Sequence, residues 1–174
     1  DAFLQSALAC PTCHGRLSIE GAGCRCPACR RPFHRVGTYV DFLDLADPAV
    51  AGVQLDFTDH YVMPDTPYAR ILRQVTERFS AALAARLQRL VGHPARCLDI
   101  GISIIDAGRI KPHLNTYERW LTVYCAINPD VHELRSEDDR LFFARAVGEY
   151  VPFSDEVFDL VLIHSTLDHC VDPD

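Results

Sequence analysis

Four cysteines near the start of the chain have the spacing of a metal site. They form two Cys-Pro-x-Cys pairs, Cys10 with Cys13 and Cys26 with Cys29. A tight turn within each pair lets both sulfurs reach one ion at about 2.3 Å. Four thiolates suit structural Zn²⁺ and leave no coordination position open for catalysis. The spacing therefore predicts a zinc site at these four cysteines, with a disulfide pair or an iron site as the alternatives.

Three nearby residues are weaker candidates for the metal. Cys24 stands two residues before Cys26 and is the ambiguous ligand, but the repeated Cys-Pro-x-Cys turn favours Cys26. His14 and His34 are interpreted as surface histidines. The 12 residues between the pairs are enough for a short hairpin with its turn at residues 21–23. Because such a module has almost no core, metal binding is expected to supply much of its folding free energy.

The charge distribution sets this segment apart from the rest of the chain. From Cys10 to Val36 there are five arginines and one acid, Glu20. The whole 174-residue chain nevertheless has a formal net charge of -7, which argues against a broad nucleic-acid surface. The basic segment is interpreted either as a solvated face or as a patch that contacts RNA or an acidic protein.

The cysteines and the apolar runs also predict where the protein resides. No run approaches the roughly 20 apolar residues needed to span a bilayer. The N-terminus has no basic region followed by an apolar segment, so no secretion signal is predicted. Clustered cysteine pairs without such a signal indicate metal binding in a reducing cytoplasm. We therefore expect a cytoplasmic protein without a membrane partner.

A second set of residues that could do chemistry follows apolar segments later in the chain. Residues 97–101 read Cys-Leu-Asp-Ile-Gly, an apolar strand that ends in Asp99 and Gly101. A glycine at this point lets the backbone approach a cofactor closely, and the carboxylate accepts hydrogen bonds from a ligand amine. Residues 150–161 read Tyr-Val-Pro-Phe-Ser-Asp-Glu-Val-Phe-Asp-Leu-Val, and residues 167–173 read Leu-Asp-His-Cys-Val-Asp-Pro.

Apolar periodicity predicts the elements that position these residues. Helical spacing from Tyr68 to Val91 predicts one long helix that packs on the core. Beyond it the chain alternates strands with short helical segments, which implies βαβ units and a parallel sheet flanked by helices. Ligands of such sheets bind at the carboxyl ends of the strands. The predicted strands are residues 95–100, 121–127, 141–147 and 158–163, with helical segments within 101–115 and 130–137.

Both parts of the chain resemble known families. Residues 8–43 resemble the Trm112-like zinc ribbon, which has the pattern CPxCxGxL, a hairpin, CxxC, an aromatic residue, a glycine turn and an apolar strand. Residues 150–173 resemble the LPF-x-D-x-x-FDLV and LEH-x-x-DP segments of class I S-adenosylmethionine-dependent methyltransferases, of the methyltransferase type 11-like kind. The resemblance implies an α/β fold in which a zinc ribbon (1–43) and a linker (44–67) precede a Rossmann-like domain (68–174), truncated after its fourth strand.

The methyltransferase resemblance also implies a function and a set of cofactor contacts. The function is methyl transfer from S-adenosylmethionine to an unidentified acceptor, beside a structural Zn²⁺. The resemblance assigns no catalytic residue, and Asp168 and His169 are interpreted as helix-capping and packing residues more than as a general base. The matching cofactor positions are Asp99 and Gly101 at the methionine part, Ser103 in the glycine-rich turn, Asn128 at the ribose hydroxyls, Gly148 and Glu149 near the adenine, and His164 in the pocket after the fourth strand.

Three departures from the family pattern motivate an alternative. The turn that should read GxGxG is Gly101-Ile-Ser-Ile-Ile105, so a branched side chain replaces its last glycine. The acid expected at the end of the second strand is Asn128, and the acid expected after the third is Val147. The alternative is a non-catalytic binding or scaffold module that carries a degenerate methyltransferase fold. A nucleotide-binding oxidoreductase is disfavoured, because the sequence lacks GxGxxG and the ribose-binding acid.

Overall fold

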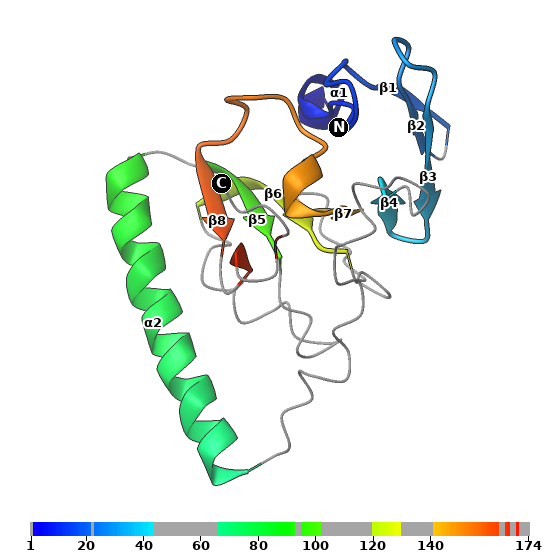
Figure 1. Cartoon of the computed structure of the whole chain (residues 1–174). Coiled ribbons are helices and arrows are strands. Elements are labelled where there is room, and N and C mark those ends of the chain that lie inside the picture. The colour runs from blue at the N-terminus through cyan, green and yellow to red at the C-terminus, as the bar shows by residue number, and fades with distance from the viewer. Residues whose placement is uncertain are drawn as a thin grey trace.

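The sheet of this protein joins its N-terminal and C-terminal segments. The computed structural model describes residues 2–21, 23–43, 66–92, 95–101, 120–129, 141–163, 166–167 and 170. Within these residues it contains a mixed sheet of eight strands in the order β1-β2-β3-β4-β7-β6-β5-β8 (Figure 1). The α/β class predicted from the sequence is therefore confirmed.

The first four strands form an antiparallel meander around the cysteine pairs. A six-residue helix, α1 (Ala2–Ala7), precedes them, and the sequence did not predict it. The strand over residues 32–36 ends at a turn that contains Gly37. The φ of Gly37 is 58°, in the left-handed region that glycine tolerates best. The strands are β1 (Ser18–Glu20), β2 (Gly23–Arg25), β3 (Pro32–Val36) and β4 (Tyr39–Asp41).

The other four strands are parallel to one another. The first two match the predicted ranges, whereas the third ends two residues earlier and the fourth begins two residues later than predicted. The fourth begins late because the Asp159 side chain, and not a backbone carbonyl, accepts from the Arg96 N–H at 2.9 Å, so Asp159 precedes the strand although it was expected inside it. The strands are β5 (Ala95–Ile100), β6 (Leu121–Ile127), β7 (Leu141–Arg145) and β8 (Leu160–Ile163).

The meander continues directly into the parallel strands. Strand β4 pairs with β7 in parallel, with Val40 opposite Ala144. The Phe42 N–H extends the ladder by donating to the Arg145 carbonyl at 2.9 Å, and the Arg145 guanidinium lies 3.2 Å from the Asp41 carboxylate. This pairing covers the edge of β7, which would otherwise present unpaired backbone groups.

Alternating residues of the parallel strands build two cores, one on each face of the sheet. On one face, Leu98, Ile100 and Ile127 belong to a cluster that extends through Phe153 into the meander and includes Cys10. Helix α1 packs there, since Phe3 contacts the cluster. On the other face, the cluster members are Cys97, Tyr124, Ala126 and Phe143, with Ala84, Leu87 and Val91 of the long helix packed among them.

Among the described residues, the long helix, α2 (Pro67–Val91), contributes to the sheet core from its C-terminal half, through Ala84, Leu87 and Val91. Its apolar residues recur every fourth position: Ile71, Val75, Phe79, Leu83, Leu87 and Val91. At about 100° per residue this stripe drifts by about 40° per step, or about 200° over five steps. The N-terminal part of the stripe therefore faces away from the sheet, and Ile71, Val75 and Phe79 are 57–61% exposed.

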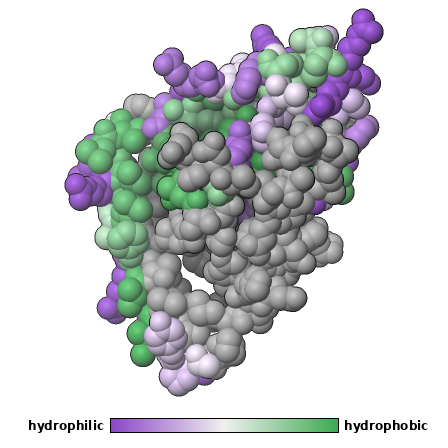
Figure 2. Space-filling model, viewed as in Figure 1, coloured by the Kyte–Doolittle hydropathy of each residue, from purple (hydrophilic) through white to green (hydrophobic). Residues whose placement is uncertain are grey.

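This exposure corrects the prediction that the whole helix packs on the core, although the predicted helix bounds hold within one residue. Figure 2 shows the hydrophobic residues that follow α2 along its visible side. Among the described helices, including α2, none combines the length and the hydropathy that crossing a bilayer requires.

Candidate metal centre and the carboxyl edge of the sheet

The four predicted metal ligands form a cluster. The Sγ atoms of Cys10, Cys13, Cys26 and Cys29 all lie within 4.8 Å of one another. The Cys10–Cys29 sulfur distance is 3.7 Å and the Cys13–Cys26 distance is 3.5 Å. Tetrahedral thiolates at about 2.3 Å from one ion are separated by about 3.8 Å, whereas a disulfide requires about 2.05 Å. The cluster is thus shaped to hold a metal such as zinc.

Each cysteine pair lies in a loop of the same hydrogen-bonded design. In both loops the N–H of the first cysteine donates to a carbonyl five residues later, and its C=O accepts from the N–H four residues later. The bonds are Cys10 N–Gly15 O at 2.8 Å, His14 N–Cys10 O at 2.8 Å, Cys26 N–Arg31 O at 2.9 Å and Arg30 N–Cys26 O at 2.7 Å. The repeated sequence therefore yields a repeated structure, in which each loop contributes two of the four sulfurs of the cluster.

The residue after each pair adopts a left-handed conformation. His14 has a φ of 55° and Arg30 a φ of 65°, a region that costs a non-glycine residue roughly 1–2 kcal/mol. Both loops therefore carry strain that the bonds around the cluster must offset. His14 is exposed, as is His34, in agreement with their interpretation as surface histidines.

Backbone N–H groups favour ionisation of one thiol of the cluster. The N–H of Cys29, together with that of Ala28, donates to the Cys26 sulfur and lowers the pKa of this thiol to about 7, against the opposing effect of desolvation. The Gly15 N–H likewise lowers the pKa of Cys13, but hydrogen bonds with the neighbouring thiols and desolvation outweigh it and raise that pKa to about 12. The Cys26 thiol therefore ionises readily, whereas the Cys13 thiol must lose its proton when a cation binds.

Cys24 belongs to the core and not to the cluster. It lies on β2 opposite Phe33 of β3 and is 5% exposed. Desolvation by burial raises its pKa, which disfavours the thiolate that a metal needs. The sequence left open whether Cys24 or Cys26 belongs to the metal site. In the structure Cys26 is in the cluster, whereas Cys24 is buried in the core.

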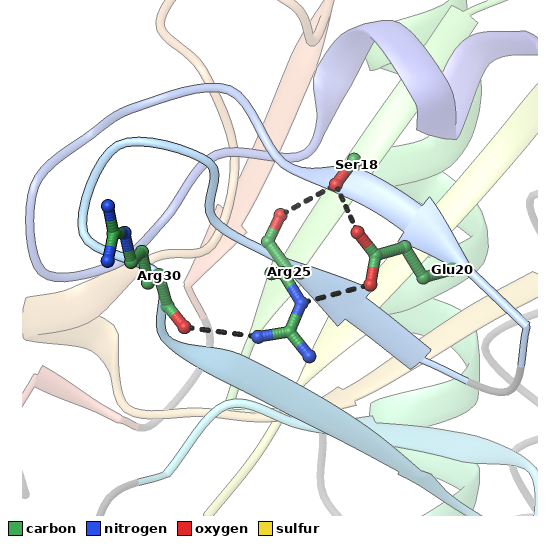
Figure 3. Close-up of polar contacts among 4 residues, drawn as sticks. All are labelled: Ser18, Glu20, Arg25 and Arg30. Atoms are coloured by element: carbon green, nitrogen blue, oxygen red, sulfur yellow. Dashed lines mark hydrogen bonds and ion pairs between the residues drawn. The ribbon is translucent and has the colours of Figure 1, made fainter.

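Part of the basic charge around the cluster is neutralised locally. The Arg25 Nε lies 3.0 Å from the Glu20 carboxylate, and Arg25 also donates to the Arg30 carbonyl at 3.4 Å. Ser18 completes this network by donating to the Arg25 carbonyl at 3.1 Å. Figure 3 shows that the Arg30 side chain points away from the other three residues. Arg30 is exposed and so remains available to an anionic partner.

Five of the seven predicted cofactor residues lie at one edge of the sheet. The Gly101 N–H donates to the Ile127 carbonyl at 2.9 Å, which places Gly101 beside Asn128 at the carboxyl ends of β5 and β6. The Asn128 N–H donates in turn to Ala144 of β7 at 3.2 Å. Asp99 is the penultimate residue of β5, and Gly148 and Glu149 begin the short helix η1 (Gly148–Tyr150) after β7. Ser103 and His164 lie outside the described residues, as do Ile105, Asp168 and His169.

A tyrosine that the sequence did not single out binds one of these residues. The Tyr124 hydroxyl, on β6, donates to the Asp99 carboxylate on β5. Tyr124 is 1% exposed, so its hydroxyl requires an internal partner. The contact depends on the register of β5 and β6, in which Cys97 lies opposite Tyr124 and Asp99 is two residues further along β5. The sequence alone does not specify this register.

Gly101 is also packed against the segment that follows β8. Its φ is 76°, and a β-carbon at this position would overlap the side chain of Thr166. The Thr166 hydroxyl lies 3.3 Å from the Ile100 carbonyl and 3.4 Å from the Gly101 carbonyl. Thr166 can thus pack this closely only because residue 101 has no side chain.

The geometry therefore comprises a thiol cluster that can hold a metal and a row of polar residues and glycines at the carboxyl edge of the parallel strands. Both features arise from segments that the sequence singled out. No model of a known protein family matches the chain, and no curated protein matches its sequence.

Proposed function

We propose that the protein binds S-adenosylmethionine at the carboxyl edge of β5, β6 and β7 and transfers its methyl group to an acceptor. The observation that carries this proposal is the strand order β7-β6-β5-β8. From β5 the chain moves outward through β6 to β7 and then returns to place β8 on the other side of β5. In Rossmann-like sheets this reversal creates a switch point, and ligands bind outside the carboxyl ends of the strands beside it.

The residues at this edge are chemically suited to the cofactor. The Asp99 carboxylate accepts hydrogen bonds from an amine, and the Asn128 amide can bond a ribose hydroxyl. Gly148 and Glu149 follow β7 on the side proposed for the adenine. When bound, the sulfonium cofactor supplies an already activated methyl group, so the protein's main tasks are to align the acceptor and to exclude water. Ser103 and His164 complete the proposed set.

We further propose that the thiol cluster holds a structural Zn²⁺. Support comes from the four-sulfur donor set and from the closed arrangement of the two loops, which leaves no coordination position for a substrate. An iron site has the same donors, and metal analysis of the purified protein distinguishes the two. Reduced thiols of this kind are consistent with a cytoplasmic protein.

Isothermal titration of the zinc-loaded chain with S-adenosylmethionine tests the cofactor proposal. Saturable binding is expected. Asp99→Asn should weaken it by about 10- to 100-fold, because a hydrogen bond to a charged group contributes roughly 1.5–3 kcal/mol. Asp155→Asn is the matched control, since Asp155 is exposed and lies outside the proposed site. Absence of binding by the zinc-loaded protein would contradict the proposal.

One structural observation favours the alternative of a non-catalytic module. Thr166 occupies the side of Gly101 that lacks a β-carbon, where a family member's cofactor would be expected to approach, and Ile105 replaces the last glycine of the turn. If this alternative holds, Ile105→Gly should create cofactor affinity that the natural chain lacks. The basic ribbon, with Arg30 exposed, would then be the binding surface, and RNA or an acidic protein its partner.

A further inference from the structure

Residues 7–10, here called the strap, connect the metal cluster to the segment that follows β7. On one side the strap bonds to the segment that follows the first cysteine loop, where the Leu17 N–H donates to the Leu8 carbonyl at 3.2 Å. On the other side it bonds to residues 152–154. These bonds are Ala9 N–Pro152 O at 3.1 Å and Ser154 N–Ala7 O at 2.8 Å, on either side of a bridge between Leu8 and Phe153.

The strap is buried, so solvent cannot replace these bonds while the fold is intact. Leu8 and Ala9 are each 1% exposed, and Cys10, which ends the strap as a metal ligand, is 0% exposed. Leu8, Cys10 and Phe153 belong to one hydrophobic cluster, which also contains Ile100 at the end of β5. Cys10 and Phe153 are therefore linked through one continuous core.

The segment from residue 146 to residue 154 has its other attachment at the carboxyl edge of the sheet. The Ala146 N–H donates to the Asn128 carbonyl at 3.4 Å. Helix η1 lies between the two attachments. Its first residue, Gly148, lies beside Ile100: a β-carbon on Gly148 would be 3.4 Å from the Ile100 side chain. The strap therefore fixes one end of the segment that carries Gly148 and Glu149.

We propose that metal occupancy anchors residues 146–154 through the strap and thereby controls ligand binding at the carboxyl edge. The ion ties together two loops that each contain a strained left-handed residue, so its loss removes the constraint on Cys10. The strap then loosens, and residues 152–154 lose their hydrogen-bond partners. Because coupling between two binding sites is reciprocal, a ligand at the edge should in turn raise the affinity for the metal. The ligand part of this inference rests on the proposed function.

Hydrogen exchange of the full chain, with zinc and after its removal by a chelator, tests the anchor directly. The reporters are the N–H groups of Ala9 and Ser154. The references are the N–H groups of Ala95 and Gly101, which bond to β6 and its flank. Metal removal should accelerate exchange at the reporters by at least about tenfold and at the references by less than about twofold. Unchanged reporters, or equal acceleration of all four groups, would overturn the anchor.

Two cysteine variants separate loss of metal from general damage to the ribbon. Cys29→Ser removes an exposed ligand, and it should reproduce the metal-free exchange pattern even with zinc present. Cys24→Ser alters a buried cysteine outside the cluster, and it should leave Ala9 and Ser154 protected when zinc is bound. Equal acceleration in the two variants would show that damage to the ribbon, and not the metal, loosens the strap.

A titration with S-adenosylmethionine then tests the ligand part. The dissociation constant should rise by about tenfold or more when zinc is removed. An unchanged dissociation constant would overturn the control of ligand binding. If even the zinc-loaded protein fails to bind the cofactor, the proposed function fails, while the exchange rates still decide whether the metal anchors residues 146–154.

Discussion

Thr166 packs against the one side of Gly101 where any other residue would carry its side chain. The contact joins the ends of two adjacent parallel strands, since Gly101 follows β5 and Thr166 lies three residues after β8. Two requirements therefore converge on residue 101: a φ of 76° and the lack of a β-carbon. The sequence suggested a cofactor as the reason for this glycine, and the structure supplies a packing reason that applies with or without one.

The first prediction concerns the substitution Gly101→Ala. It should lower the free energy of unfolding by roughly 2–4 kcal/mol, because left-handed strain and steric overlap add together. Chemical denaturation measures this loss. Gly37→Ala is the matched control: Gly37 has a φ of 58°, but a β-carbon there would meet nothing within 4 Å. Its substitution should cost only about 1 kcal/mol.

The companion substitution Thr166→Ala identifies the source of the extra loss. The threonine hydroxyl and methyl group are the atoms nearest to a β-carbon at residue 101. Their removal in the double variant should therefore restore part of the stability lost in Gly101→Ala. Strictly additive losses in the two single variants would show that Thr166 does not restrict residue 101.

The second prediction concerns the partly buried hydrogen bond between Tyr124 and Asp99. Tyr124→Phe leaves the carboxylate without this donor and should lower the free energy of unfolding by about 1.5–3 kcal/mol. Tyr68→Phe should change stability by less than about 0.5 kcal/mol, because Tyr68 is 72% exposed. A double-mutant cycle with Asp99→Ala isolates the pair, and a coupling energy near zero would mean that the hydrogen bond contributes nothing to stability.

The third prediction tests the unequal packing of α2. Phe79→Ala should cost less than about 0.5 kcal/mol, because Phe79 is 60% exposed. Leu87→Ala, eight residues later on the same stripe, should cost about 2 kcal/mol, because Leu87 packs against the sheet core. Comparable losses from both substitutions would mean that the N-terminal half of the helix is also packed in solution.

How much of this fold was predictable depends on the sequence separation of the contacts. Strands β5 and β6 matched their predicted ranges because an apolar run marks a strand locally. The four cysteines of the cluster were identified for the same reason, since each pair occupies a single turn. The pairing of β4 with β7 was missed because it joins residues about 100 positions apart, and no local pattern specifies such a partner.

The details that sequence reasoning missed depend on register or on accumulated rotation. The contact between Tyr124 and Asp99 exists only because of the way β5 and β6 align. The exposure of Phe79 was detectable in principle, since a four-residue repeat drifts on a helix of 3.6 residues per turn. The cofactor roles of all seven residues stay predictions, and two of them, Ser103 and His164, also lie outside the described part of the chain.

The last prediction concerns the pH dependence of metal binding. In the metal-free protein the pKa of Cys26 is lowered to about 7, so its ionisation stabilises the fold at high pH. A depressed pKa gives a contribution that is complete above the unfolded value near 9.0 and is lost as the pH falls through about 7. Because the proposed zinc site binds the metal through thiolates, zinc affinity should fall steeply between about pH 8 and pH 6.

Calorimetry in buffers of different ionisation enthalpy counts the protons released with the metal. The pKa of Cys13 is raised to about 12, so this thiol is protonated at neutral pH and must release its proton to the buffer when it binds an ion. At least one proton per ion is therefore expected at about pH 8, where Cys26 is already largely ionised. Cys24→Ser should leave this number unchanged, because Cys24 lies outside the cluster. Binding without proton release would mean that Cys13 is not a thiolate ligand.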